Sequence, residues 1–172
     1  ANNILSYKGN IIGRSIKEDN CETIVEEIFK TSKIHSCSII YPVDVMTGKN
    51  MGDKCQAKEL NEVKKDDLIL DIGPKTIKNI LNTIENSKTV LWNGPAGYFE
   101  NPNFANGSFE IAKKIIEKNK KKLIFSVVGG GDTISLLNQI DALNNFNFVS
   151  TAGGAFLNYL EGKELPGIKA LK

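Results

Sequence analysis

The stretch Lys121–Asn138, KKLIFSVVGGGDTISLLN, decides the fold expected of this chain. Its apolar run, Leu123 to Val128, is rich in β-branched and aromatic residues, which is typical of a buried strand. Three glycines follow, and apolar residues at helical spacing begin after Asp132 and Thr133. A helix that starts at a strand end directs unpaired N–H groups and a positive dipole end toward an anion. Gly129–Thr133 therefore predicts a phosphate-binding turn.

Four further apolar runs predict strands, and helical periodicity predicts the helices between them. The predicted strands are Ser36–Asp44, Leu68–Ile72, Thr89–Trp92 and Phe146–Thr151, with residues 45–67 predicted as a loop. The predicted helices cover residues 20–33, a segment opening at Pro74, a segment capped by Ser108, and residues 155–161 closed by Gly162. Asp19 or Asn20 is the predicted cap of the first helix.

This alternation of strands and helices predicts an α/β fold. We expect a three-layer, Rossmann-like open parallel sheet with helices on both faces, organised as a single domain over residues 1–172. Ligands of such sheets bind at the carboxyl ends of the strands. Four predicted turns lie there: Ile72–Lys75, Asn93–Glu100, Gly129–Thr133 and Thr151–Gly154. The last two contain adjacent glycines that lead into a helix.

The composition narrows the function class. The chain is 41% hydrophobic and 24% charged and carries a net charge of +2. It has neither a membrane-length apolar run nor a signal-peptide pattern. We therefore expect a soluble, cytoplasmic protein with no nucleic-acid or membrane partner. Arg14 is the only arginine, although bidentate phosphate clamps usually use arginine. Cys21, Cys37 and Cys55 form no C-x-x-C pair, which argues against a zinc site or a disulfide framework.

Three residues leave their roles open at this stage. The carboxylate of Asp132 repels phosphate unless Mg²⁺ intervenes, so it either holds that ion or caps the following helix. Asp44 either projects into a ligand crevice or starts a loop. His35 is interpreted as a surface or capping residue. Neither the dinucleotide fingerprint G-x-G-x-x-G nor the G-x-x-x-x-G-K-[ST] motif is present, which makes a nicotinamide-dependent oxidoreductase a poor fit.

Six linked motifs connect the chain to a known family. In chain order they are YPVD (41–44), DIGPKT (71–76), WNGPAGYFE (92–100), VVGGGDT (127–133), STAGGA (150–155) and LEGKELPG (160–167). Together, over nearly the whole chain, they closely resemble the C-terminal, nucleotide-binding half of phosphoglycerate kinase.

The resemblance implies a phosphotransferase of glycolysis. Members of this family transfer a phosphoryl group reversibly between 1,3-bisphosphoglycerate and ADP, giving 3-phosphoglycerate and ATP. Mg²⁺ accompanies the ADP or ATP on the C-terminal domain, and a separate N-terminal domain binds the phosphoglycerate. The full-length protein is expected to be a monomer.

The resemblance also implies roles for individual residues. Asn93 and Pro95 are expected beside the phosphates and sugar of the nucleotide. Tyr98 is expected near the base, and Glu100 is expected to accept hydrogen bonds from the ribose hydroxyls.

The remaining implied roles concern the phosphoryl group. Gly129, Gly130 and Gly131 belong to the nucleotide site, and Gly130 and Gly131 are expected to line the group in transfer. Asp132 is the expected Mg²⁺ ligand, and Thr133 is expected to open its helix toward the phosphates. Gly153 and Gly154 are expected at a second phosphate-facing turn on the substrate side.

Among the departures from the family pattern, two bear on the site and on its completeness. Ala152 stands where the family usually has the first of three glycines. The chain also begins at Ala1-Asn2, inside the family's GG-x-x-A-N segment, so we expect the substrate domain, one strand–helix unit and the phosphate-contacting lysines to be absent from it.

From this second departure we expect a sheet truncated at its N-terminal side, self-association of the chain, and no kinase activity of the chain alone. A non-catalytic nucleotide-binding or interaction module is the alternative function.

Overall fold

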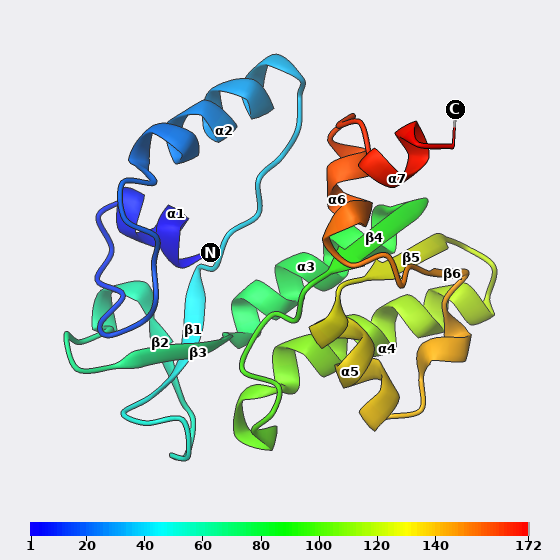
Figure 1. The fold of residues 1–172 in the computed structure, drawn as a ribbon. Helices are drawn as coiled ribbons and strands as arrows, with labels where there is room; N and C mark the ends of the chain where they lie inside the picture. The colour runs from blue at the N-terminus through cyan, green and yellow to red at the C-terminus, as the bar shows by residue number, and fades with distance from the viewer. Residues whose placement is uncertain (172) are drawn as a thin grey trace. The chain divides into compact units, whose positions relative to one another are not determined.

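The computed structural model describes residues 1–171 (Figure 1). Contacts between Cα atoms divide the chain into two compact units. Unit 1 comprises residues 1–83 and 96–111, and unit 2 comprises residues 84–95 and the chain from residue 112 onward. The helices α3 (Pro74–Asn86) and α4 (Asn106–Lys120) are divided between the two units. The single-domain organisation stays a prediction.

Unit 1 contains the helices α1 (Asn2–Tyr7) and α2 (Glu22–Ile34) and a three-stranded sheet. The strands β1 (Asp44–Gly48), β2 (Gln56–Glu59) and β3 (Leu68–Ile72) lie in the order β2-β1-β3, and both pairings are antiparallel. A short 3₁₀ helix, η1 (Leu60–Glu62), follows β2. One buried hydrophobic cluster of this unit is formed by Leu5, Ile12, Val45 and Val63, with Tyr41, Leu60 and Ile69 packed against it.

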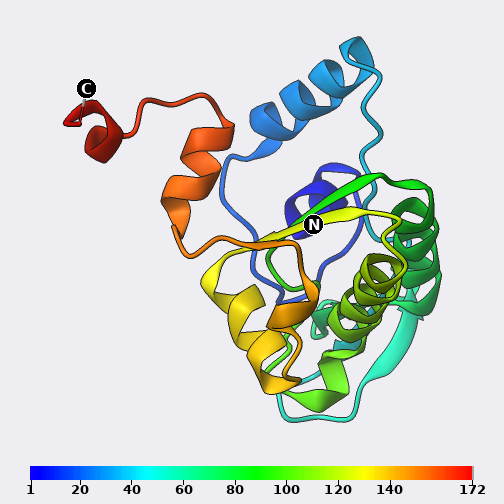
Figure 2. The ribbon, with the colours of Figure 1, turned by 90° about the vertical axis from the view of Figure 1, so that its right-hand side faces the viewer.

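Unit 2 contains a parallel sheet flanked by helices, which confirms the predicted α/β class (Figure 2). The strands β4 (Thr89–Asn93), β5 (Phe125–Gly129) and β6 (Phe148–Val149) lie in that order. They connect to α5 (Gly131–Gln139), η3 (Leu143–Asn145), α6 (Gly154–Leu160) and α7 (Pro166–Lys169).

Two predictions about strands are wrong. Residues 37–43 form no regular element, and the strand begins only at Asp44, because Pro42 has no N–H to donate to a ladder. Residues 45–67, predicted as a loop, contain most of the β1–β2 hairpin. The exposed strand β2 reads QAKE and carries no apolar periodicity that could have revealed it.

The arrangement of β3 also differs from the prediction. This strand was expected in the parallel sheet, but it pairs antiparallel with β1.

Two capping predictions are wrong as well. Cys21 is the N-cap of α2, while Asn20 turns the chain before it with a φ of 56°. Ser108 lies inside α4, where its hydroxyl accepts a hydrogen bond from the Ala96 N–H.

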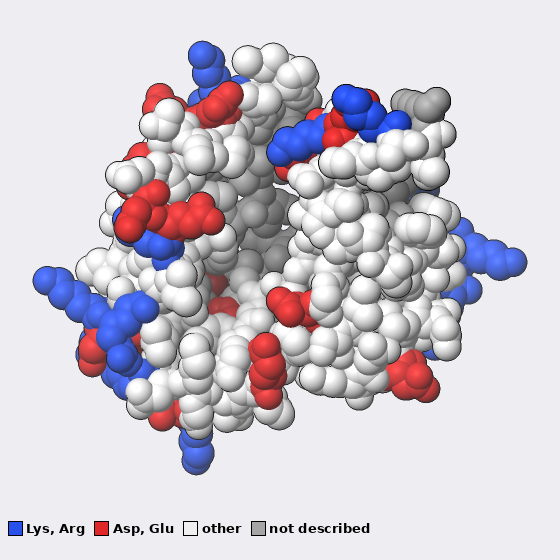
Figure 3. All heavy atoms as spheres, viewed as in Figure 1, with Lys and Arg blue, Asp and Glu red and all other residues white. Residues whose placement is uncertain are grey.

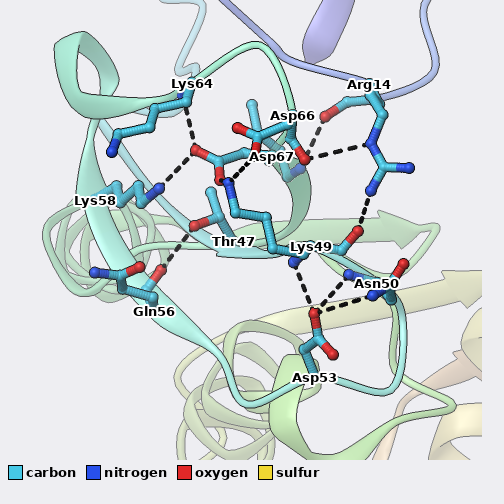
Figure 4. Close-up of polar contacts among 12 residues, drawn as sticks. Arg14, Thr47, Lys49, Asn50, Asp53, Gln56, Lys58, Lys64, Asp66 and Asp67 are labelled. Carbon is cyan, nitrogen blue, oxygen red and sulfur yellow. Dashed lines mark hydrogen bonds and ion pairs between the residues drawn. The ribbon is translucent and has the colours of Figure 1, made fainter.

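A buried carboxylate organises the polar side of unit 1 (Figure 4). Asp67 is 1% exposed, and its oxygens accept hydrogen bonds from Lys58 Nζ at 2.6 Å, Lys49 Nζ at 2.8 Å and the Lys64 N–H at 2.7 Å. Its backbone carbonyl accepts a further bond from the Arg14 N–H at 2.7 Å. Burial alone would raise the pKa of Asp67, but the bonds from Lys49 and Lys58 hold it well below its usual range.

Charged side chains of both signs are interspersed elsewhere on the surface. On the face drawn in Figure 3, acidic and basic side chains lie at several separate places and no large patch of a single sign forms. Within the described part of the chain, no helix has the length and apolarity needed to cross a bilayer.

The Asp67 network makes a prediction about stability. Replacing Asp67 by Asn leaves the buried Lys58 ammonium without its carboxylate, and we expect the free energy of unfolding to fall by about 3 kcal/mol at pH 7. Urea denaturation followed by circular dichroism measures this change. Asp66→Asn is the matched control, because Asp66 pairs with the same Lys49 from an exposed position and its loss is expected to leave the unfolding midpoint nearly unchanged. Equal midpoints for the two variants would contradict the role of burial.

Candidate functional site

The carboxyl ends of the parallel strands in unit 2 bring several predicted site residues together. Asn93, the last residue of β4, pairs with Gly129, the last residue of β5. The N–H of Ser150, just beyond β6, donates to the Val128 carbonyl at 2.8 Å. The chain segments at residues 93, 129 and 150 thus leave the sheet at one edge.

The glycine turn at this edge is closed on one side and open on the other. Gly130 is the N-cap of α5 and has a φ of 86°, a value that residues with L side chains rarely adopt. A Cβ at Gly130 would lie 3.0 Å from Asn93 Oδ1, and one at Gly129 would lie 3.0 Å from the Phe156 ring. At Gly131, by contrast, no described atom beyond its chain neighbours and its own helix backbone lies within 4 Å of the Cβ position. Space for a ligand therefore exists at the first residue of α5.

The two polar residues of the turn have different surroundings. Thr133 is fully buried, and its hydroxyl accepts a hydrogen bond from the Gly94 N–H at 2.7 Å. Its side chain thus joins the two turns of the site and does not face a ligand. Only the backbone N–H of Thr133, in the first turn of α5, can contribute to binding. Asp132 is exposed in the first turn of α5. Because Gly130 is the N-cap, the interpretation of Asp132 as the helix cap is wrong.

The second glycine turn lies next to the first. Phe156 of α6 contacts Gly129, which places the start of α6 beside the end of β5. Gly153 has a φ of 55°, and both Gly153 and Gly154 are exposed with no atom within 4 Å of either Cβ position. The buried Ser150 hydroxyl accepts a bond from the Ala152 N–H at 3.4 Å. Backbone amides of this turn are therefore accessible at the same edge.

The residues expected around the sugar and base are divided between the units. Asn93 and Pro95 belong to unit 2, whereas Tyr98 and Glu100 belong to unit 1. Tyr98 is half-buried and donates its N–H to the Leu70 carbonyl at 2.7 Å, while Glu100 is exposed. The 3₁₀ helix η2 (Pro102–Phe104) follows and buries Phe104 completely.

One of the four predicted ligand turns is filled by the protein itself. The carboxylate of the buried Asp44 accepts hydrogen bonds from the N–H groups of Lys75 and Thr76, each at 2.8 Å, and from the Thr76 hydroxyl at 2.7 Å. It also lies so close to Gly73 that a Cβ there would be 2.3 Å from Asp44 Cγ. Asp44, the first residue of β1, thus caps α3, and both alternatives, a ligand contact and a loop start, are wrong.

Sequence reasoning missed the buried aspartate of β3, Asp71. Its side chain is 2% exposed and accepts hydrogen bonds from the N–H groups of Ile72 and Gly107, both at 2.8 Å. Burial is the largest influence on this carboxyl and raises its pKa to about 6, while the two amides act in the opposite direction. The available signal was an acid within an apolar strand, two residues before a glycine.

The Asp71 carboxyl makes a prediction about pH. Its folded pKa of about 6 exceeds the reference value of 3.8, so the folded chain binds more protons than the unfolded chain between these values. The Asp71 contribution to the free energy of unfolding is therefore expected to fall, by up to about 3 kcal/mol, as pH rises from about 4 to about 6. Urea titrations of the parent chain and Asp71→Asn across this range measure it. A stability difference between the two chains that stays constant with pH would contradict the assignment.

Together, the parallel sheet, the open glycine turn and the exposed acid give an α/β protein with a candidate anion-binding site at its strand ends. Comparison with known proteins makes this specific. A family model described as phosphoglycerate kinase matches residues 1–163. The chain belongs to the phosphoglycerate kinase family, a family of glycolytic kinases.

Individual relatives agree with the family model. The chain is 40% identical to a phosphoglycerate kinase of Azorhizobium caulinodans and 41% identical to one of Caulobacter vibrioides, and each alignment covers the whole chain and 44% of the relative. The solved structure of phosphoglycerate kinase from Coxiella burnetii superposes with a TM-score of 0.90 at 34% identity, covering 99% of this chain and 44% of that one. The enzyme of Pyrococcus horikoshii gives 0.70 at 28% identity, covering 99% and 42%. The chain therefore spans less than half the length of these relatives.

Proposed function

We propose that this chain supplies the Mg-ADP/ATP-binding part of a phosphoglycerate kinase, which transfers a phosphoryl group between 1,3-bisphosphoglycerate and ADP in the cytoplasm. The observation that carries the proposal is the convergence of Asn93, the Gly129–Thr133 turn and the Gly153–Gly154 turn at one edge of the parallel sheet. The open position at Gly131 lets a phosphate approach the backbone amides of α5, whose dipole favours negative charge.

The residues fit a magnesium nucleotide. Among residues 1–171, no group of three or more His, Cys, Asp or Glu side chains could hold a metal ion by itself. Mg²⁺ commonly takes one or two carboxylates and completes its shell with substrate phosphates and water. Asp132 is exposed one residue after the open Gly131, so it is suited to be that carboxylate. The ion, when bound, neutralises charge on the phosphates.

Each remaining residue of the proposed site has a binding role. Asn93 and Pro95 flank the phosphates and sugar, Tyr98 borders the base, and Glu100 accepts hydrogen bonds from the ribose hydroxyls. Gly130, Gly131, Gly153 and Gly154 give the transferring phosphoryl group access to the backbone. Transfer of this kind depends on position and charge stabilisation, which is the contribution of these turns. Phosphoglycerate would bind on the N-terminal domain of the complete enzyme.

Gly131 provides a sharp test of nucleotide binding. Because Gly131 is helical and no atom lies within 4 Å of its Cβ position, Gly131→Ala should fold as stably as the parent chain. The added methyl group would meet the phosphate, so we expect calorimetric affinity for Mg-ADP to fall at least about tenfold.

The matched control is Gly167→Ala, which is also helical with no atom within 4 Å of its Cβ position and lies outside the proposed site. Asp132→Asn should abolish the Mg²⁺ dependence of ADP binding. Unchanged ADP affinity in Gly131→Ala, or a preference of the parent chain for NAD, would contradict the proposal.

We expect the 172-residue chain alone to show no phosphoryl transfer in a coupled assay with 1,3-bisphosphoglycerate and Mg-ADP. Charge on the moving group needs cations, and the guanidinium of Arg14, the only arginine, donates to the backbone carbonyls of Lys49 and Asp66. Measurable turnover would refute this expectation. Mg-ADP binding without turnover, even when the rest of a family enzyme is added in trans, would instead favour a non-catalytic nucleotide-binding module.

We further expect this chain to self-associate, although the complete enzyme is proposed to be a monomer. One face of the parallel sheet exposes Leu91, Phe125 and Phe148 by 43%, 52% and 53%. Neighbouring exposed apolar side chains favour association in water. Light scattering should show a mass that increases with concentration, and Phe125→Ser should reduce the increase. A monomer at high concentration would count against self-association.

A further inference from the structure

We propose that Asp71 is a positioning residue for the loop of residues 96–107, which contains η2 and runs into the start of α4. The inference rests on the proposed function, because this loop carries Tyr98 and Glu100, the residues proposed to contact the base and the ribose. Asp71 itself does not need to touch the nucleotide. Its side chain acts on the loop through backbone contacts at the beginning and at the end of the loop.

The carboxylate of Asp71 is placed by its own strand. Oδ1 accepts a hydrogen bond from the N–H of the next residue, Ile72, at 2.8 Å, which sets the direction of the carboxylate relative to β3. Oδ2 accepts the N–H of Gly107 at 2.8 Å. Gly107 is the second residue of α4, so this bond uses one of the free N–H groups of the helix and holds the end of the loop.

The beginning of the loop passes against the same carboxylate. A Cβ at Gly97 would lie 2.5 Å from Asp71 Oδ1, and a Cβ at Gly107 would also lie 2.5 Å from that oxygen. Only glycine lets the backbone approach this closely. The N–H of Tyr98 then donates to the Leu70 carbonyl at 2.7 Å. Both ends of the loop are therefore held by two consecutive residues of β3.

One further bond joins the two ends, from the Ala96 N–H to the Ser108 hydroxyl at 2.8 Å, and other contacts hold the middle of the loop. Asn101 Nδ2 donates to the Met51 carbonyl at 2.6 Å, and Asn103 Nδ2 donates to the Asp53 carbonyl at 3.2 Å. The fully buried Phe104 packs against Gly48. Loss of the Asp71 contacts is therefore expected to loosen the segment around Tyr98 while residues 101–104 remain attached.

The chemistry at Asp71 requires two acceptors. Each oxygen receives one backbone N–H, so an asparagine would turn its NH₂ group toward one of the two amides. No cation is among the groups that influence this carboxyl, which faces burial and two amides only. Burying a carboxylate without a cation is unfavourable. The presence of Asp71 at this position is therefore better explained by its effect on the loop than by a gain in stability.

Hydrogen exchange of the full chain without nucleotide tests the positioning role. In Asp71→Asn we expect the Tyr98 amide to exchange at least about tenfold faster than in the parent chain. Gly97→Ala, which pushes on the same carboxylate from the loop, should have the same effect. Val63→Ala removes a buried core side chain of unit 1 and is the control for a merely structural defect. It should lower the melting temperature while leaving Tyr98 protection unchanged below the transition. Unaltered Tyr98 protection in Asp71→Asn and Gly97→Ala would overturn the inference.

Calorimetry with Mg-ADP tests the consequence for the site. Asp71→Asn and Gly97→Ala should weaken binding about tenfold, whereas Val63→Ala should bind like the parent chain. Faster Tyr98 exchange with unchanged affinity would overturn the link between the loop and the nucleotide. A parent chain that fails to bind Mg-ADP would instead refute the proposed function, and the exchange data would then decide the loop contact alone.

Discussion

The parallel pairing of β4 with β5 is the interaction on which the proposed site depends. It ends with Asn93 opposite Gly129, and the next contact along the chain, from the Gly94 N–H to the Thr133 hydroxyl, ties the two following turns together. Because Asn93 fills the inner side of the glycine turn, the free side is the one at Gly131. The direction from which a phosphate can approach is therefore a consequence of strand register.

Buried carboxylates give unit 1 a second level of organisation. Asp44 caps α3, Asp71 receives an amide from the start of α4, and Asp67 joins Lys49, Lys58 and the chain around Arg14. Each of them satisfies backbone or ammonium donors that would otherwise be buried without partners. Their electrostatic surroundings differ, since two lysines lower the pKa of Asp67 while burial raises that of Asp71. The contribution of Asp67 to the free energy of unfolding is therefore lost as pH falls, whereas that of Asp71 decreases as pH rises.

The features predicted successfully share a strong local signal. The strand, glycine turn and helix around Gly129 combine a continuous apolar run, residues able to adopt positive φ, and a 3.6-residue period. The failures occur where local signals are weak or misleading. The apolar segment before Pro42 resembles a strand but has no ladder partner, whereas QAKE is a strand only because β1 lies beside it. Ser108 has the composition of a helix cap but uses its hydroxyl for the distant Ala96 amide.

The sequence by itself determined the α/β class, the glycine turns and the family, because these depend on short-range periodicity and on motifs of adjacent residues. Only the tertiary structure decided which turns remain open. Asp44, Asn93 and Phe156 each lie far in sequence from the glycines that they contact, and no local pattern specifies such contacts. Long-range packing thus closed the turn at Gly73 with a carboxylate and left the one at Gly131 free, since each partner was brought there by strand pairing and helix packing.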